Sequence, residues 1–274
     1  MNITIKTKNM RSMGKMFNLL TINILALFIF GCNGEHKSIP AKNHHLLVFI
    51  DKSASVAGNA DGFSTQFAAQ MDPILNQTVQ TKGDRVAAYL IHGSTTGNAV
   101  VLEKVFKVNI PTKSGKGPET FKSEMDNFQN DLLRFRKQVG QELINYLEDK
   151  STGEANRQTD ALGSLEVIST FMNTVPKGDT CLVVYMSDMV HAQAQPRNYN
   201  ARPLKDLPEA KTCAEQDFAW LQTNRKVDGS RFENLQVHII FPSGNTQMTQ
   251  NDKMMYYWEA LFGKVCAEVQ VTRN

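Results

Sequence analysis

Short apolar runs alternate with longer stretches of helical periodicity along most of the chain. Apolar residues at consecutive positions are typical of strands that are buried on both faces of a parallel sheet. Such runs predict strands at Leu46–Ile50, Arg85–Ile91, Val100–Ile110, Thr180–Asp188, Leu235–Phe241 and Ala267–Thr272. Apolar residues at helical spacing predict helices at Phe63–Val79, Glu119–Lys150, Leu162–Met172, Ala210–Thr223 and Lys253–Val265.

This order of elements predicts an α/β fold, with one doubly wound, mostly parallel sheet of the Rossmann type and helices on both faces. Only the turn-rich residues 93–98 separate the second and third strands, which indicates a hairpin. We therefore expect the third strand to lie antiparallel at one edge of the sheet. The domain is expected to span residues 44–274, without an internal repeat.

The stretch Glu119–Lys150 carries a long apolar stripe on one helical face. Packing of this stripe on its own sheet is the simplest interpretation, because it lacks the sustained charge pattern of a coiled coil. Gly140 leaves two alternatives, a single long helix or two helices joined at that residue.

Candidate chemistry first appears at the end of the first predicted strand. Leu46–Ile50 ends abruptly in Asp51-Lys52-Ser53-Ala54-Ser55. In open α/β sheets, ligands bind just beyond the carboxyl ends of such strands. Asp51, Ser53 and Ser55 would offer hard oxygen ligands there, of the kind that Mg²⁺ and Mn²⁺ prefer.

A second predicted buried strand also ends in an acid, Asp188. Adjacent strands lie about 5 Å apart, so neighbouring strands would bring Asp51 and Asp188 within reach of one ion. Thr159 lies at the start of the helix that leads into the Asp188 strand. An N-cap role for Thr159 or Asp160 accounts for these two residues equally well.

Taken together, Asp51, Ser53, Ser55, Thr159 and Asp188 resemble the metal-ion-dependent adhesion site of the von Willebrand factor A, or integrin I-like, domain. The resemblance covers about residues 44–273 and implies that family's fold. It also implies that these five residues hold Mg²⁺ or Mn²⁺, and that a protein partner offers a carboxylate to the ion. The long helical stretch before Thr159 departs from the compact family form.

A catalytic use of the same site would need a general base beside the ion. His92 and His191 are the only histidines expected at this edge, and a surface loop position without a catalytic role is the simpler interpretation of His191. The chain also lacks a G-x-S-x-G motif and a phosphate-binding glycine loop. We therefore expect a binding module rather than an enzyme. A hydrolase or phosphotransferase that uses the Asp cluster and a metal-free scaffold are the alternatives.

The loop that follows Asp188 should lie at the same edge of the sheet. Its residues His191, Arg197 and Arg202 are candidates for contact with an acidic partner around the ion. A loosely packed, solvated loop is the alternative.

The amino-terminal segment has the pattern of an export signal. Residues 1–16 are polar and basic, and residues 17–31 are mostly apolar but too short for a comfortable membrane span. The following Ile29-Phe30-Gly31-Cys32 resembles a bacterial lipobox, although a residue smaller than Phe30 is commoner at that position. The resemblance implies a lipidated Cys32, a polar tether over residues 32–43, and a membrane-anchored lipoprotein in the bacterial cell envelope that faces outside the cytoplasm. A plain signal anchor is the alternative.

Charge and cysteine content bear on nucleic-acid binding and on disulfide bonds. The formal charge of the chain is +3, but residues 1–31 hold four basic residues and no acid, so their removal leaves 26 basic against 27 acidic residues. This balance gives no support to nucleic-acid binding, which needs a basic footprint. Besides Cys32, the chain has Cys181, Cys213 and Cys266, which fit either buried thiols or one disulfide and a free thiol.

Overall fold

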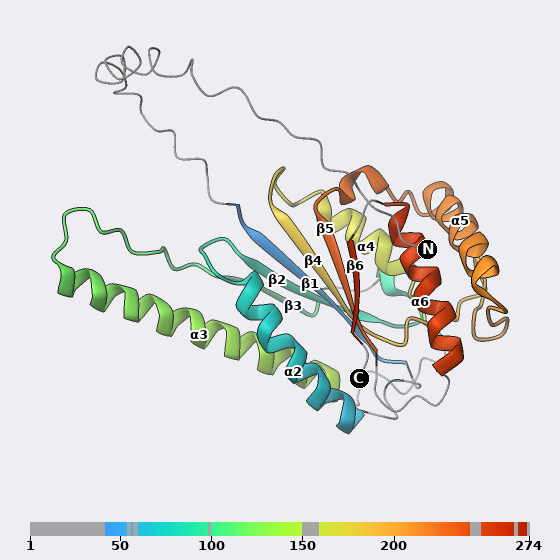
Figure 1. Ribbon diagram of the computed structural model, residues 1–274, viewed down its shortest axis with the longest axis horizontal. Coiled ribbons are helices and arrows are strands. Elements are labelled where there is room, and N and C mark those ends of the chain that lie inside the picture. Colours follow the sequence, from blue (N-terminus) through green and yellow to red (C-terminus); the bar gives the residue numbers. More distant parts are fainter. Residues whose placement is uncertain are drawn as a thin grey trace, which may run out of the picture. The chain divides into compact units, whose positions relative to one another are not determined.

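Six strands form one mixed sheet in the order β3-β2-β1-β4-β5-β6 (Figure 1). This computed structural model describes residues 42–53, 56, 60–97, 100–149, 159–241, 248–265 and 268–272. The strands are β1 (His44–Asp51), β2 (Arg85–Ile91), β3 (Leu102–Val105), β4 (Thr180–Met186), β5 (Leu235–Ile240) and β6 (Glu268–Thr272). Neighbouring strands are parallel except for β2 and β3, which are antiparallel. The predicted α/β class with one antiparallel edge strand is confirmed.

The helices form two layers, one on each face of the sheet. Successive side chains of β1 point to opposite faces and so enter two separate apolar clusters. Leu46, Val48 and Ile50 lie in one cluster, with α2 (Ala60–Thr78) and α3 (Pro118–Glu148). Leu47 and Phe49 lie in the other cluster, with α4 (Gly163–Met172), α5 (Leu207–Asn224) and α6 (Met248–Gly263). Two short 3₁₀ helices, η1 (Thr95–Gly97) and η3 (Gly229–Phe232), complete the described elements. The predicted placement of helices on both faces is therefore confirmed.

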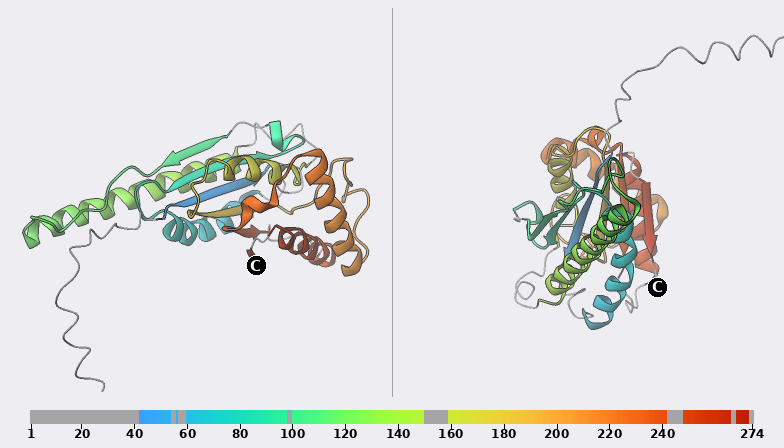
Figure 2. Two further views of the ribbon diagram at one scale, coloured as in Figure 1. Left: turned by 90° about the horizontal axis from the view of Figure 1, so that it is seen from above. Right: turned by 90° about the vertical axis from the view of Figure 1, so that its left-hand side faces the viewer.

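The stretch before Thr159 is a single helix, α3, of 31 residues. Gly140 lies inside it, and a Cβ atom there would be 3.5 Å from Leu75 Cδ1 of α2. Gly140 is therefore where α2 and α3 pack closely, and the alternative of a joint between two helices is wrong. A helix of this length measures about 46 Å, whereas the eight residues of β1 span about 26 Å. The first turns of α3 consequently extend past the strands (Figure 2).

The third strand is shorter than predicted. β3 ends at Val105, which pairs with Arg85 at the very start of β2. The Phe106 amide still donates to Asp84 O, and Phe106 O accepts from the Gly83 amide. Residues after Phe106 leave the sheet because β2 has no residues left to pair with them. The prediction from apolar alternation, which extended the strand to Ile110, was therefore too long.

The compact unit begins at Lys42. The predicted signal segment, Cys32 and most of the predicted tether lie outside the described residues, as do Ser55 and Cys266. Within the described ranges, no helix has the length and apolar character needed to cross a membrane.

Candidate metal centre

The ends of β1 and β4 bring two carboxylates together at the carboxyl edge of the sheet. These strands are parallel neighbours in which Ile50 pairs with Met186, so Asp51 lies level with Ser187 and Asp188 follows one residue further along. The chain builds outward from β1 on one side and from β4 on the other. The two acids therefore lie at the topological switch point, where open α/β sheets bind ligands.

Hydrogen bonds fix the orientation of both carboxylates. Asp51 Oδ1 accepts from the Ser53 amide at 2.8 Å, and Asp51 Oδ2 accepts from the Ser187 hydroxyl. Asp188 Oδ1 accepts from the Val190 amide at 3.0 Å. A carboxylate has about four lone-pair sites, so it can accept such hydrogen bonds and also coordinate a cation.

The electrostatics of this edge favour a positive charge. Asp51 is 1% exposed and Asp188 is 5% exposed. Burial, followed by the charge of Asp188, raises the pKa of Asp51 to about 7, against the opposing effect of the hydrogen bonds from Ser187 and Ser53. Two buried like charges repel each other, and a divalent cation between them would remove this repulsion.

Backbone pairing brings Thr159 to the same edge. The Asp160 amide donates to His92 O, directly after β2, and Thr159 O accepts from the Ala192 amide in the loop after β4. The Asp160 carboxylate caps the first turn of α4 by accepting from the Gly163 amide at 2.9 Å. Thr159 is buried, and its hydroxyl forms no hydrogen bond with the other described residues. The capping role thus belongs to Asp160, and the Thr159 hydroxyl is available as a ligand.

The resulting donor set fits a hard divalent cation. It consists of two carboxylates with the hydroxyls of Ser53 and Thr159, all of them oxygen donors. In the part of the chain that the structure describes, no group of three or more His, Cys, Asp or Glu side chains could hold a metal ion. A cation at this edge would therefore depend on hydroxyls, on water and on Ser55, the predicted ligand outside the described residues.

Lys52, between the predicted ligands Asp51 and Ser53, has a structural role that its sequence position did not reveal. Its ammonium donates to Tyr146 O at 2.9 Å, to Leu147 O at 3.1 Å and to Asp149 O. These carbonyls form the last turn of α3, where the helix dipole favours a cation. Lys52 thereby ties the carboxyl end of α3 to the edge of the sheet that holds Asp51.

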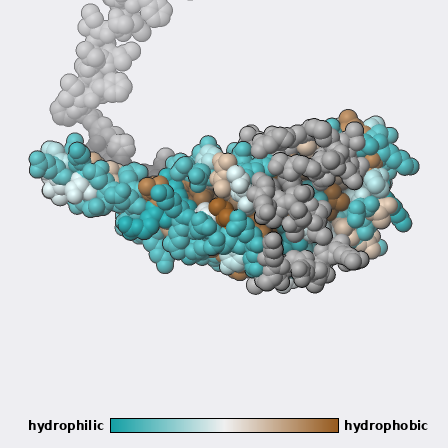
Figure 3. Space-filling view, turned by 90° about the horizontal axis from the view of Figure 1, so that it is seen from below, coloured by the Kyte–Doolittle hydropathy of each residue, from teal (hydrophilic) through white to brown (hydrophobic). Residues whose placement is uncertain are grey.

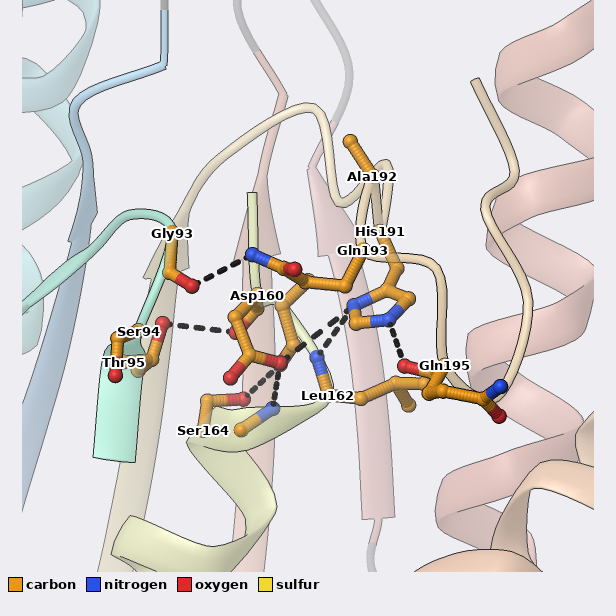
Figure 4. A network of polar contacts seen from close by, with 12 residues as sticks. Gly93, Ser94, Thr95, Asp160, Leu162, Ser164, His191, Ala192, Gln193 and Gln195 are labelled. Carbon is orange, nitrogen blue, oxygen red and sulfur yellow. Dashed lines mark hydrogen bonds and ion pairs between the residues drawn. The ribbon is translucent and has the colours of Figure 1, made fainter. Parts of the chain in front are cut away.

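His191 is fully buried, so its predicted surface position in contact with a partner is wrong. Figure 4 shows the ring between Asp160, Leu162 and Gln195. The Leu162 amide donates to His191 Nδ1 at 3.4 Å, and Nε2 lies 2.9 Å from Gln195 O. Burial lowers the pKa of His191, so the ring is neutral and donates from Nε2. Both nitrogens are engaged in holding the loop, which leaves neither for a catalytic base.

The two arginines of the loop differ. Arg197 binds α5, since its Nη2 lies 3.1 Å from Glu209 Oε1 and its Nη1 lies 3.0 Å from Cys213 Sγ. The side chain of Arg202 is exposed. Of the three predicted contact residues, only Arg202 has an exposed side chain that forms no ion pair with another described residue, and its contact with a partner stays a prediction.

The described cysteines are buried thiols. Cys181 and Cys213 are free, and burial raises the pKa of Cys181 to about 12. The structure therefore has no disulfide between these two residues.

Comparison with known proteins gives no family assignment. No protein-family model matches the chain, and no curated protein matches it in sequence. Among solved structures it is similar to proximal thread matrix protein 1 from the mussel byssus (TM-score 0.37, 10% identity, 82% of this chain and 48% of that one). It is also similar to the pilus adhesin SpaC from Lactobacillus rhamnosus GG (TM-score 0.40, 14% identity, 85% and 28%). A third is a von Willebrand factor type A protein from Catenulispora acidiphila (TM-score 0.36, 9% identity, 85% and 39%). The chain spans less than half the length of each, and the scores are too low to carry an argument, so the fold is assigned from the strand order alone.

Proposed function

We propose that this chain is a membrane-anchored module that binds a divalent cation, Mg²⁺ or Mn²⁺, and docks a protein partner through it. Asp51, Ser53, Ser55, Thr159 and Asp188 are the proposed ligands, with waters in the remaining positions. A carboxylate from the partner would replace one water and bridge the two proteins. Cys32 is the proposed site of lipid attachment.

One observation carries the proposal. Two buried carboxylates lie at or just beyond the ends of adjacent parallel strands at the topological switch point, and burial together with the charge of Asp188 raises the pKa of Asp51. Two buried charges of like sign repel each other, and a divalent cation bound between them would offset this repulsion. Ser53 supplies a further oxygen donor, as does the hydroxyl of Thr159, which forms no hydrogen bond with the other described residues.

Metal-dependent stability tests the cation. Mg²⁺ or Mn²⁺ at about ten times its dissociation constant is expected to raise the free energy of unfolding by about 1.4 kcal/mol, because it binds only the folded state. Asp188→Asn should abolish this increase, whereas Asp126→Asn, at an exposed position on α3, should leave it intact. Thermal unfolding with and without a chelator measures the effect, and equal increases in all three proteins would contradict the proposal.

The pH dependence of stability provides a second test. The folded-state pKa of Asp51 is raised from 3.8 to about 7, so the folded state retains a proton that the unfolded state has lost. The contribution of Asp51 to stability should therefore decline as pH rises from about 4 to about 7 in the presence of a chelator. Since the cation binds the deprotonated acid, stabilisation by Mg²⁺ should grow over the same interval. Chemical denaturation across this range, with Asp51→Asn as control, would refute the assignment if the variant kept both trends.

A further inference from the structure

The end of α3 remote from Asp51 belongs to a projection that we call the arm, formed by Phe106–Gly117 and the first turns of α3, Pro118–Phe128. Val105 pairs with Arg85, which in turn pairs with His45 near the start of β1, so this row marks the amino edge of the sheet. The chain continues from there away from the strands. The first buried residue of α3 is Phe128, which confirms that the preceding turns lie outside the core.

Large apolar side chains are exposed where the arm leaves the sheet. Val105 is 39% exposed, Val108 36% and Ile110 49%. Phe106 between them is buried, with its ring centroid 5.9 Å from that of Phe128 and 5.4 Å from that of Phe135 on α3. Phe106 thus fixes the segment on α3 and holds its neighbours outward. In Figure 3 the tapered end of the molecule is mainly hydrophilic, with small hydrophobic patches where it widens.

Basic side chains are interleaved with these apolar ones. The segment from Lys104 to Gly117 contains four lysines and no acid, whereas the first turns of α3 in the arm contain one lysine and three acids. The ammonium groups of Lys104 and Lys116 form ion pairs with Glu142 and Glu124 of α3. Lys107 and Lys113 form no ion pair with any described residue, so their charges remain available to an external anion.

We propose that the arm rests on an anionic membrane surface, with Val108 and Ile110 in the headgroup layer and Lys107 and Lys113 beside lipid phosphates. Exposed apolar residues interleaved with lysines are the chemistry of an interfacial segment, and each lysine near such a surface contributes about 1 kcal/mol. The choice of a membrane over a peptide rests on the proposed function, because the anchored segment would join the domain at Lys42, two residues before β1, at this same edge. The arm would then hold the metal centre away from the membrane, at the far end of α3.

Vesicle binding by the unlipidated domain tests the arm separately from the anchor and from the metal. Residues Lys42–Asn274 form a compact unit with two apolar cores and can be produced without Cys32. This domain should sediment with vesicles of equal parts phosphatidylcholine and phosphatidylglycerol, but not with pure phosphatidylcholine. Binding should weaken about thirtyfold for Lys107→Ala with Lys113→Ala, and about tenfold for Val108→Ser with Ile110→Ser.

A matched control makes the same changes elsewhere. Leu207→Ser with Lys211→Ala alters an exposed leucine and an exposed lysine on α5 and should leave vesicle binding unchanged. All of these side chains are exposed or partly exposed, so the melting temperature should not move in any variant. The proposal is overturned if the unsubstituted domain fails to bind anionic vesicles, or if the arm variants bind as well as the control. These results do not depend on lipidation of Cys32 or on metal binding. Failure of this proposal is therefore distinguishable from failure of the proposed function.

Discussion

Lys52→Met is expected to lower the free energy of unfolding by about 3 kcal/mol, because it removes a buried charged donor from the last turn of α3. The ammonium serves three carbonyl groups, those of Tyr146, Leu147 and Asp149, and Lys52 is only 4% exposed. Methionine keeps the apolar stem of the side chain, so the loss reports on the hydrogen bonds and not on packing.

Lys104→Met is the matched control for this measurement. Lys104 also contacts α3, through an ion pair with Glu142 of 2.9 Å, but both side chains are about one-third exposed. Its replacement should cost less than about 1 kcal/mol. Urea denaturation of the two variants gives the comparison. If the Lys52 variant is no less stable than the Lys104 variant, the proposed link between α3 and the edge of the sheet that holds Asp51 is ruled out.

Gly163→Ala is expected to be about as damaging, with a loss of about 3 kcal/mol. A Cβ atom at this position would lie 2.4 Å from Asp160 Oδ2 and 2.8 Å from Arg225 Nη1. These atoms form an ion pair of 2.9 Å, and Asp160 is buried beside His191. The methyl group would force the pair apart and leave the Asp160 carboxylate without its counter-charge.

Gly140→Ala makes the same glycine-to-alanine change, but it is expected to stabilise the domain rather than destabilise it. Gly140 lies within α3, and its added Cβ would make an ordinary contact at 3.5 Å from Leu75 Cδ1. Alanine in a continuous helix should stabilise the domain by up to about 1 kcal/mol. Denaturation of both variants separates the two environments; destabilisation by Gly140→Ala, or tolerance of Gly163→Ala, would show that these packing assignments are incorrect.

The sheet and its two acids could be predicted from the sequence because a buried strand is marked locally by a run of consecutive apolar residues. Consecutive apolar residues in Leu46–Ile50 and in the Asp188 strand identify central strands directly, and the parallel register then brings Asp51 and Asp188 together. The short hairpin loop likewise identified β3 as antiparallel. Its length was overestimated, because an apolar alternation persists in the arm where no neighbouring strand is present.

The residues whose burial or role was not predicted are held by contacts with residues distant in the sequence. His191 follows a strand and precedes a loop rich in proline, which resembles an exposed position, yet Asp160 and Leu162 from α4 and its approach enclose it. Lys52 has no local signal for a helix cap, since its acceptors lie more than ninety positions further along the chain. Gly140 lies beside Leu75 of α2 inside a continuous α3, a neighbour that sequence periodicity does not report.

Direct titration of the domain with Mn²⁺, followed by electron paramagnetic resonance of the free ion, tests the central claim most directly. We expect one saturable Mn²⁺ site, from which Mg²⁺ displaces the bound ion. The site should be lost in Asp51→Asn and in Asp188→Asn but retained in Asp126→Asn. Both buried variants should remain folded in chelator, because each removes one of two repelling charges. Absence of saturable binding to the unsubstituted domain, or binding that survives both buried substitutions, would contradict a metal centre at the ends of β1 and β4.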